Sequence, residues 1–365
     1  MVLVMKNLKI LYLLIPLLMC SGCDSSSNIS SPTNIPDETS SIEDTRKEGY
    51  FHIYTNSPHG EVVLESDYVE KDSTINFTIA PFKGWEAFLW YIESDSGALD
   101  LINKTSFTMP SEDVTITVTY KSNYLLADTL AHTGYGGGYT NAYNTRRSFT
   151  EASQKNFAGI ETDIQITLDG KFVCAHDPYF VSGGKQISIS NNNYDDIKNY
   201  IIDNAYGDTE AKIVPFEDYL EICKSGQKLA TIELKSYTSK AQCEKLIGII
   251  EEKYDLNNVM FISFSMANLE NIKNINSGIR CAYLVNEYSG NIYDPMKYLD
   301  EDWESYIELD VTFSMFDEEV AKAYHDLGIK VGVYTVDSKE SAIKYQNMGA
   351  DYITTNLCEM EIVNE

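Results

Sequence analysis

Eight short apolar segments alternate with amphipathic ones between residues 125 and 355, and no other feature constrains the fold as strongly. The segments with strand character are 125–132, 159–167, 228–235, 259–264, 280–285, 305–310, 330–336 and 351–355. Helical patterns lie between most of them, at 146–157, 215–225, 239–254, 266–276, 317–327 and 338–348, whereas 286–304 has no full helical pattern. Eight strands separated by helices can close into a parallel barrel. The sequence therefore predicts an α/β fold, a (β/α)8 TIM barrel, over residues 123–365.

Acids and histidines stand at the ends of several of these predicted strands. Residues i and i+2 of a strand point to the same face, so Glu161 projects together with Asp163, and Glu233 together with Lys235. The carboxyl ends of the strands of such a barrel meet at one mouth, where active sites lie. We therefore expect these side chains to converge with His132, which ends the first strand, and with His176 of a His-Asp-Pro segment.

The charge of the chain restricts its partners. The 365 residues carry a formal net charge of −27, which argues against nucleic acid as a partner, because binding phosphates needs a basic face. Three converging carboxylates would also repel an anionic phosphodiester unless a cation lay between them. Because oxygen ligands suit hard cations, the sequence predicts a site for Mg²⁺ or Ca²⁺ formed by Glu161, Asp163 and Glu233.

Residues 125–178 resemble the glycerophosphodiester phosphodiesterase family, whose members are barrel enzymes of the phospholipase C-like kind. The shared order is a strand ending in His, an Asn-Thr helix start, Glu-x-Asp, Asp-Gly and His-Asp-Pro. The resemblance continues through PFEDYL, IELK, FISFS, VGVYTVD and ADYITTN, and so covers residues 125–357.

This resemblance implies a reaction and roles for the residues at the matching positions. His132 and His176 would be the general acid and base, and Glu161, Asp163 and Glu233 would bind the divalent cation. Lys235 would lie near the phosphate. The glycerol hydroxyl beside the phosphate would attack first, and water would then open the cyclic phosphate. The products would be sn-glycerol 3-phosphate and an alcohol.

Several positions depart from the family pattern around the substrate. Thr133 stands where the family has Arg, Tyr334 where it has Trp, and Asn356 where it has Asp. We assign Thr133 and Tyr334, with Lys235, to substrate binding, in a pocket that is reshaped at its substrate end. The candidates for replacing the missing positive charge are Arg146, Arg147 and Lys185, although pairing on a helix surface is the expected use of the two arginines.

A separate β-rich module is predicted for residues 47–122. Its segments alternate polar and apolar residues with a period of two, which is typical of short antiparallel strands. Gly84-Trp85, Trp90 and the closing FTMPSEDVTITV segment resemble the repeat modules of bacterial surface proteins of the internalin B-repeat type, which implies a β-grasp-like spacer or adhesion unit.

The N-terminal residues predict export and anchoring. Two lysines precede an apolar run that ends in Ser21-Gly22-Cys23, and this resembles a bacterial lipoprotein signal over residues 1–22, with Cys23 as the lipidated residue. A plain secretory signal and a single membrane anchor are the alternatives. Residues 23–46 are rich in Ser and lack apolar periodicity, so we expect a disordered tether. The predicted location is the cell envelope, outside the cytoplasm and held to the membrane by lipid.

Two other functions remain open at this stage. The barrel could be catalytically altered or inactive and serve for binding at the surface. Alternatively, it could act on a related lipid phosphodiester, as a lysophospholipase D or an enzyme of phospholipase C type does.

Overall fold

The computed structural model describes residues 47–99, 102–137, 141–288 and 303–361. The predicted signal segment 1–22, the tether 23–46 and Cys23 lie outside the described residues. No helix within those ranges is long and apolar enough to cross a membrane.

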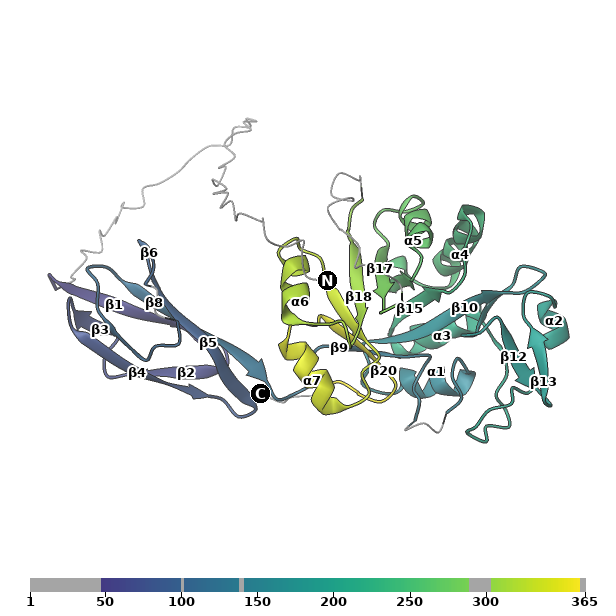
Figure 1. Ribbon diagram of the computed structural model, residues 1–365, viewed down its shortest axis with the longest axis horizontal. Coiled ribbons are helices and arrows are strands. Elements are labelled where there is room, and N and C mark those ends of the chain that lie inside the picture. The colour runs from purple at the N-terminus through teal and green to yellow at the C-terminus, as the bar shows by residue number, and fades with distance from the viewer. Residues whose placement is uncertain (1–46, 100–101, 138–140, 289–302, 362–365) are drawn as a thin grey trace, which may run out of the picture. The chain divides into compact units, whose positions relative to one another are not determined.

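Eight parallel strands form a closed barrel, which confirms the predicted fold (Figure 1). The first strand closes the barrel because it pairs with both the second and the last. All eight predicted strands are present, with boundaries displaced by a few residues. They are β9 (Asp128–Ala131), β10 (Gly159–Ile166), β15 (Leu229–Leu234), β16 (Val259–Ser263), β17 (Arg280–Val285), β18 (Ile307–Thr312), β19 (Val331–Tyr334) and β20 (Tyr352–Thr355).

Helices surround the strands, and all six predicted helical segments contain one. The first begins at Thr145, whose hydroxyl accepts from the backbone N–H of Ser148 in a capping box. The helices are α1 (Arg146–Ser153), α3 (Phe216–Gly226), α4 (Lys240–Lys253), α5 (Met266–Lys273), α6 (Glu318–His325) and α7 (Lys339–Asn347). Five of them are shorter than predicted, and α3 has the predicted length, displaced by one residue.

Apolar side chains that point inward from the strands form one layer in the barrel interior. Inward-facing side chains of four strands pack together, namely Leu130, Met260, Ile262, Ala282, Leu284 and Tyr352. Gly332 of β19 makes room for the largest of them, because a Cβ there would lie 2.1 Å from the ring of Tyr352. The layer closes the interior, so polar side chains farther along the strands meet at the mouth.

An insertion follows the second barrel strand and was not predicted. β11 (Phe172–Cys174) turns back antiparallel along β10, and β14 (Val214–Pro215) pairs with β11. Between these two strands lie the hairpin of β12 (Tyr179–Ser182) and β13 (Lys185–Ser188), and the short helix α2 (Tyr194–Ile197). A 3₁₀ turn, η1 (Leu256–Asn258), precedes β16. Because β11 ends beside β10, the residues after it, including His176, return to the barrel mouth.

The region before the barrel is mostly β, as predicted. One sheet has the order β3-β1-β8-β5-β6 and the other β2-β4-β7, and their buried side chains share one core. No helix occurs in the described part of residues 47–122, so the region has two packed sheets instead of the helix-covered sheet of a β-grasp. Its strands are β1 (Tyr50–Asn56), β2 (Gly60–Leu64), β3 (Tyr68–Glu70), β4 (Thr74–Pro81), β5 (Trp85–Ser94), β6 (Gly97–Ala98), β7 (Ser106–Thr108) and β8 (Val114–Ser122).

Candidate active site

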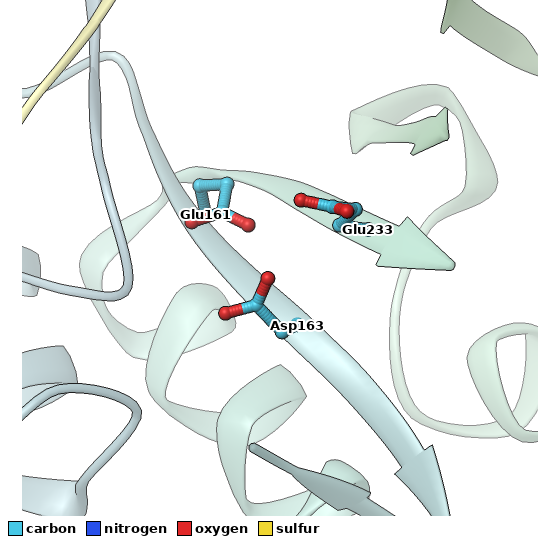
Figure 2. Close-up of side chains that lie close together, drawn as sticks. All are labelled: Glu161, Asp163 and Glu233. Carbon is cyan, nitrogen blue, oxygen red and sulfur yellow. The ribbon is translucent and has the colours of Figure 1, made fainter. Parts of the chain in front are cut away.

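Three carboxylates meet inside the barrel mouth, as the strand periodicity predicts. Glu161 and Asp163 project from β10, and Glu233 projects from β15 at the position paired with Asp163 (Figure 2). Each offers an oxygen within 4.8 Å of the others. All three are buried, with 1% of Glu161, 0% of Asp163 and 6% of Glu233 exposed. Charged side chains at this depth are destabilising unless they are paired or bind a cation.

The cluster contains more negative charge than the protein neutralises. Lys235 Nζ lies 3.1 Å from Asp163 Oδ1 and 3.0 Å from Glu233 Oε1. Glu161 Oε1 has no hydrogen-bond partner among the described residues. Burial, then repulsion from Asp163 and Glu233, raises the pKa of Glu161 well above its usual range. Burial and Asp163 likewise raise the pKa of Glu233 to about 7. A buried, oxygen-only donor set with an unpartnered oxygen fits Mg²⁺ or Ca²⁺.

Backbone and amide donors orient the carboxylates toward one another. The N–H of Thr133 donates to Glu161 Oε2 at 2.7 Å, and Asn144 Nδ2 donates to Asp163 Oδ2 at 2.8 Å. Asn144 Oδ1 in turn accepts from the hydroxyl of Thr162 at 2.7 Å. Backbone and amide donors thus hold one oxygen of Glu161 and one of Asp163. The other oxygen of Asp163 lies near Lys235, and that of Glu161 has no hydrogen-bond partner in the described structure. The sequence marked Asn144 only as part of a helix start, and its position before the N-cap gave no signal of this role.

Thr133 occupies a strained turn and does not line the cavity. Its φ is +52°, a conformation that is uncommon for a β-branched residue. The side chain is buried, and its hydroxyl donates to the carbonyl of His132 at 2.7 Å. Gly134 follows at φ +84°, where a Cβ would lie 2.5 Å from Ser148 Oγ. The predicted role of Thr133 in substrate binding therefore has no support from its side chain, and its backbone N–H positions Glu161 instead.

A chain of hydrogen bonds fixes the orientation of His132. Its Nδ1 lies 3.0 Å from Asn356 Oδ1, and Asn356 Nδ2 donates to Asp337 Oδ2 at 2.8 Å. The Asn356 backbone N–H also donates to Asp337, at 2.7 Å. Because only the amide nitrogen can donate to a carboxylate, the amide oxygen must face the histidine. An amide oxygen only accepts, so the proton is on Nδ1 of the neutral ring and the lone pair is on Nε2.

Burial also keeps His132 neutral. Desolvation lowers the pKa of this imidazole from its ordinary value of 6.5, against the opposing effect of the bond to Asn356. A neutral ring with a free Nε2 lone pair can accept a proton near neutral pH.

His176 has a different environment. It follows β11 in the insertion, and its side chain is 58% exposed. Its Nδ1 lies 2.9 Å from Asp177 Oδ1, and Gln165 Nε2 donates to its carbonyl at 3.1 Å. This leaves Nε2 available for proton transfer at the cavity edge.

These groups line one cavity of about 170 Å³. His132, His176, Glu161, Glu233 and Lys235 form its polar side, as predicted, and Tyr334 contributes to the apolar side with Ile262, Phe264 and Leu284. The Tyr334 hydroxyl donates to the carbonyl of Val285 at 2.9 Å, so its ring rather than its hydroxyl faces the cavity. Arg146 and Arg147 instead pair with Asp218 and Glu151.

Asp310 of β18 also lines the cavity and was missed from sequence. Burial, then Glu308 and Glu233, raises its pKa well above the usual range. The available signal was the Glu-x-Asp spacing of Glu308 and Asp310 within an apolar strand, which matches that of Glu161 and Asp163.

Stability should depend jointly on pH and on divalent cations. Raised pKa values mean that the cation-free folded state holds protons that the unfolded chain releases, so stability falls as pH rises from about 4.5 through about 7. A cation that binds the ionised acids reverses this loss, by about 2.7 kcal/mol at a hundredfold excess over Kd. We expect Mg²⁺ or Ca²⁺ to raise the melting temperature more at about pH 8 than at about pH 5.

Thermal unfolding in chelator and in each cation measures this effect. Glu161→Gln should reduce both the pH dependence and the cation response. Glu251→Gln, at an exposed position on α4, is the matched control and should change neither. A cation response that is equal at both pH values, or unchanged in Glu161→Gln, would contradict the assignment.

The hydrogen-bond chain to His132 makes a separate prediction. Asn356→Leu removes the acceptor that holds the proton on Nδ1, so both ring tautomers should become populated and the pKa of His132 should fall further. Nitrogen NMR of the histidines reads the tautomer directly, without any requirement for activity. An unchanged Nδ1-protonated ring in the variant would refute the proposed tautomer control.

The barrel region is similar in sequence to known proteins. Residues 132–360 match the family described as the Glycerophosphoryl diester phosphodiesterase family. The chain is 25% identical over 236 residues to the uncharacterized protein YqiK of Bacillus subtilis (strain 168), covering 63% of this chain and 94% of that protein.

Solved structures share the barrel. A glycerophosphodiester phosphodiesterase from Parabacteroides distasonis has 24% identity and a TM-score of 0.53, covering 63% of this chain and 94% of its own. A phosphodiesterase from Oleispira antarctica, in complex with the product sn-glycerol-3-phosphate, has 20% identity and a TM-score of 0.55, covering 63% and 93%. The matched residues contain the acid cluster and both cavity histidines, and the chain thus belongs to the glycerophosphoryl diester phosphodiesterase family, a class of phosphoric diester hydrolases.

Proposed function

We propose that this protein hydrolyses glycerophosphodiesters to sn-glycerol 3-phosphate and an alcohol, with a divalent cation and histidine acid–base catalysis. The observation that carries the proposal is the shared cavity, which places two histidines beside a buried cluster of three carboxylates. The product bound to the Oleispira relative is the phosphate that this reaction would release.

Glu161, Asp163 and Glu233 would hold the cation, Mg²⁺ or Ca²⁺. When bound, it would neutralise the cluster and stabilise negative charge that develops on the phosphoryl oxygens. Lys235, already within 3.1 Å of two of these acids, would add a second positive charge next to the phosphate. Together they would overcome the repulsion between an acidic protein and an anionic substrate.

The two histidines would divide the proton transfers according to their environments. His132 Nε2, which is kept unprotonated, would accept the proton of the glycerol hydroxyl beside the phosphate as that oxygen forms its bond to phosphorus. His176 would donate a proton to the departing alcohol as its bond to phosphorus breaks. Water would then open the cyclic phosphate with the roles reversed, since His176 has lost a proton and His132 has gained one.

The alternatives differ in what they require of the same residues. An inactive binding barrel does not need the unpaired Glu161 oxygen or a fixed tautomer of His132, and both features favour an enzyme. A lysophospholipase D or phospholipase C type of enzyme would use the same acids and histidines on a different diester. Comparing glycerophosphocholine with lysophospholipids and diacyl lipids as substrates separates these activities.

Activity should require both histidines and the cation. We expect release of glycerol 3-phosphate from glycerophosphocholine with Mg²⁺ or Ca²⁺ and its loss in chelator. His132→Ala and His176→Ala should lower kcat by about 10²- to 10⁴-fold, the usual contribution of a general acid or base. The acid limb of the pH profile should lie below the ordinary histidine value of 6.5, because the pKa of His132 is lowered.

His325→Ala is the matched control, because this histidine, the last residue of α6, pairs with Asp351 and does not line the cavity. It should retain activity within a few-fold. Absence of turnover on any glycerol phosphodiester, or equal activity of all three histidine variants, would sink the enzyme proposal.

We further propose that the protein is a lipoprotein of the cell envelope, anchored through Cys23 outside the cytoplasm. The support is the sequence of residues 1–23, in which an apolar run precedes Ser-Gly-Cys. The surface-type repeat at residues 47–122 would then lie between the lipid and the barrel along the chain.

Cys23→Ser tests the anchoring. In a bacterial host, the full chain should partition with membranes and incorporate labelled fatty acid, whereas the variant should do neither. Cys358→Ser, which changes a buried thiol in the barrel, controls for loss of a cysteine as such. Fatty-acid labelling that persists in Cys23→Ser would exclude this residue as the anchor.

A further inference from the structure

Asp310 lies across the barrel from the carboxylate cluster. Three strands lie between β10 and β18 in either direction around the barrel. These two strands therefore stand opposite each other. The Asp310 side chain is 1% exposed and lines the cavity. Its Oδ1 has no hydrogen-bond partner among the described residues. It is not one of the three acids that come together for a cation.

The residues that flank Asp310 on the neighbouring strands are apolar. Its neighbours at the same level are Leu284 on β17 and Gly332 on β19, and Ile262 lies on the same side of the cavity. Charged groups still act on this carboxyl, since Glu308 and Glu233 raise its pKa and Arg280 lowers it. Asp310 is thus a cavity-lining carboxyl whose flanking residues offer it no polar side chain.

No hydrogen bond or ion pair within the described structure accounts for this carboxyl. Glu308, two residues earlier on the same strand, is held by Arg280 through bonds of 2.5 and 2.8 Å. Asp310 has no such partner in the described structure, and leaving a buried polar group unpaired costs about 1–3 kcal/mol. Burial raises the pKa of Asp310 well above its usual range. In its protonated form the carboxyl does not repel an anionic ligand, and it can both donate and accept a hydrogen bond. A hydroxyl group is its natural partner.

We propose that Asp310 binds the terminal hydroxyl of the glycerol unit and makes the enzyme selective for glycerol phosphodiesters. This inference rests on the proposed function. With the phosphate beside Lys235 and the acid cluster, the three-carbon unit extends across the cavity to β18. Its CH groups contact Ile262 and Leu284, and its terminal hydroxyl reaches Asp310. The cavity of about 170 Å³ is small beside the roughly 300–1,000 Å³ of pockets for larger ligands, so the variable alcohol points toward solvent.

A matched pair of substrates tests the contact. One is glycerophosphoethanolamine. The other carries a methyl group in place of the terminal CH₂OH and keeps the hydroxyl beside the phosphate. The wild type should prefer the first by roughly 10- to 100-fold in kcat/KM, the effect of one buried hydrogen bond. Asp310→Leu should reduce this preference to about one by slowing the first substrate. Asp310→Asn, which still donates and accepts, should keep most of it.

Three results would overturn the proposal. Asp310→Leu could slow both substrates equally, the wild type could show no preference, or the variant could change the preference among alcohols instead of the preference for the hydroxyl. If Asp310→Leu does not fold, Asp310→Ala takes its place in the same comparison.

Failure of the proposed function would be recognised separately, because the wild type would then turn over neither substrate. Calorimetric binding of sn-glycerol 3-phosphate and of propane-1,2-diol 1-phosphate, in Ca²⁺, would still test the contact. The wild type should bind the first more tightly, and Asp310→Leu should bind both alike. Equal binding of both by the wild type would refute the role of Asp310.

Discussion

The arrangement of the barrel mouth depends on the mutual repulsion of three buried carboxylates. Glu161, Asp163 and Glu233 project inward because parallel pairing of β10 with β15 puts Asp163 beside Glu233. Lys235 offsets part of the charge, and one oxygen of Glu161 has no partner in the described structure. The protein thus maintains an electrostatically unfavourable arrangement that a divalent cation would relieve, which is typical of functional sites.

Groups from the loops after the strands maintain this arrangement. The strained turn at Thr133 aims a backbone N–H at Glu161, and Asn144 holds Asp163 just before α1 begins. Asn356 and Asp337 orient His132 from the other end of the domain. The strands supply the positions of the reactive groups, while the loops determine how those groups point. Position alone would leave each carboxylate and imidazole free to rotate.

The fold was predictable because its signals are local. Period-two strands, intervening helical patterns and the i, i+2 spacing of Glu161 with Asp163 all lie within short windows. The bond between Asn356 and Asp337 depends on the meeting of two loops, which no local pattern encodes. β11 and β14, at three and two residues, are too short for periodicity to detect. Asp310 stands in a Glu-x-Asp pair with Glu308, and only closure of the barrel put it opposite the cluster.

Barrel closure has a consequence for when the site is completed during synthesis. His132 stands at the start of the barrel domain, and its hydrogen-bond partner Asn356 follows the last strand, 224 residues later. A nascent chain therefore carries all the acids of the cluster and both cavity histidines before the residue that sets the tautomer of His132 has been made. A protein that stopped short of β20 would hold the expected cation ligands with an unoriented imidazole. Orientation of His132 therefore depends on the last strand of the barrel and the residue that follows it.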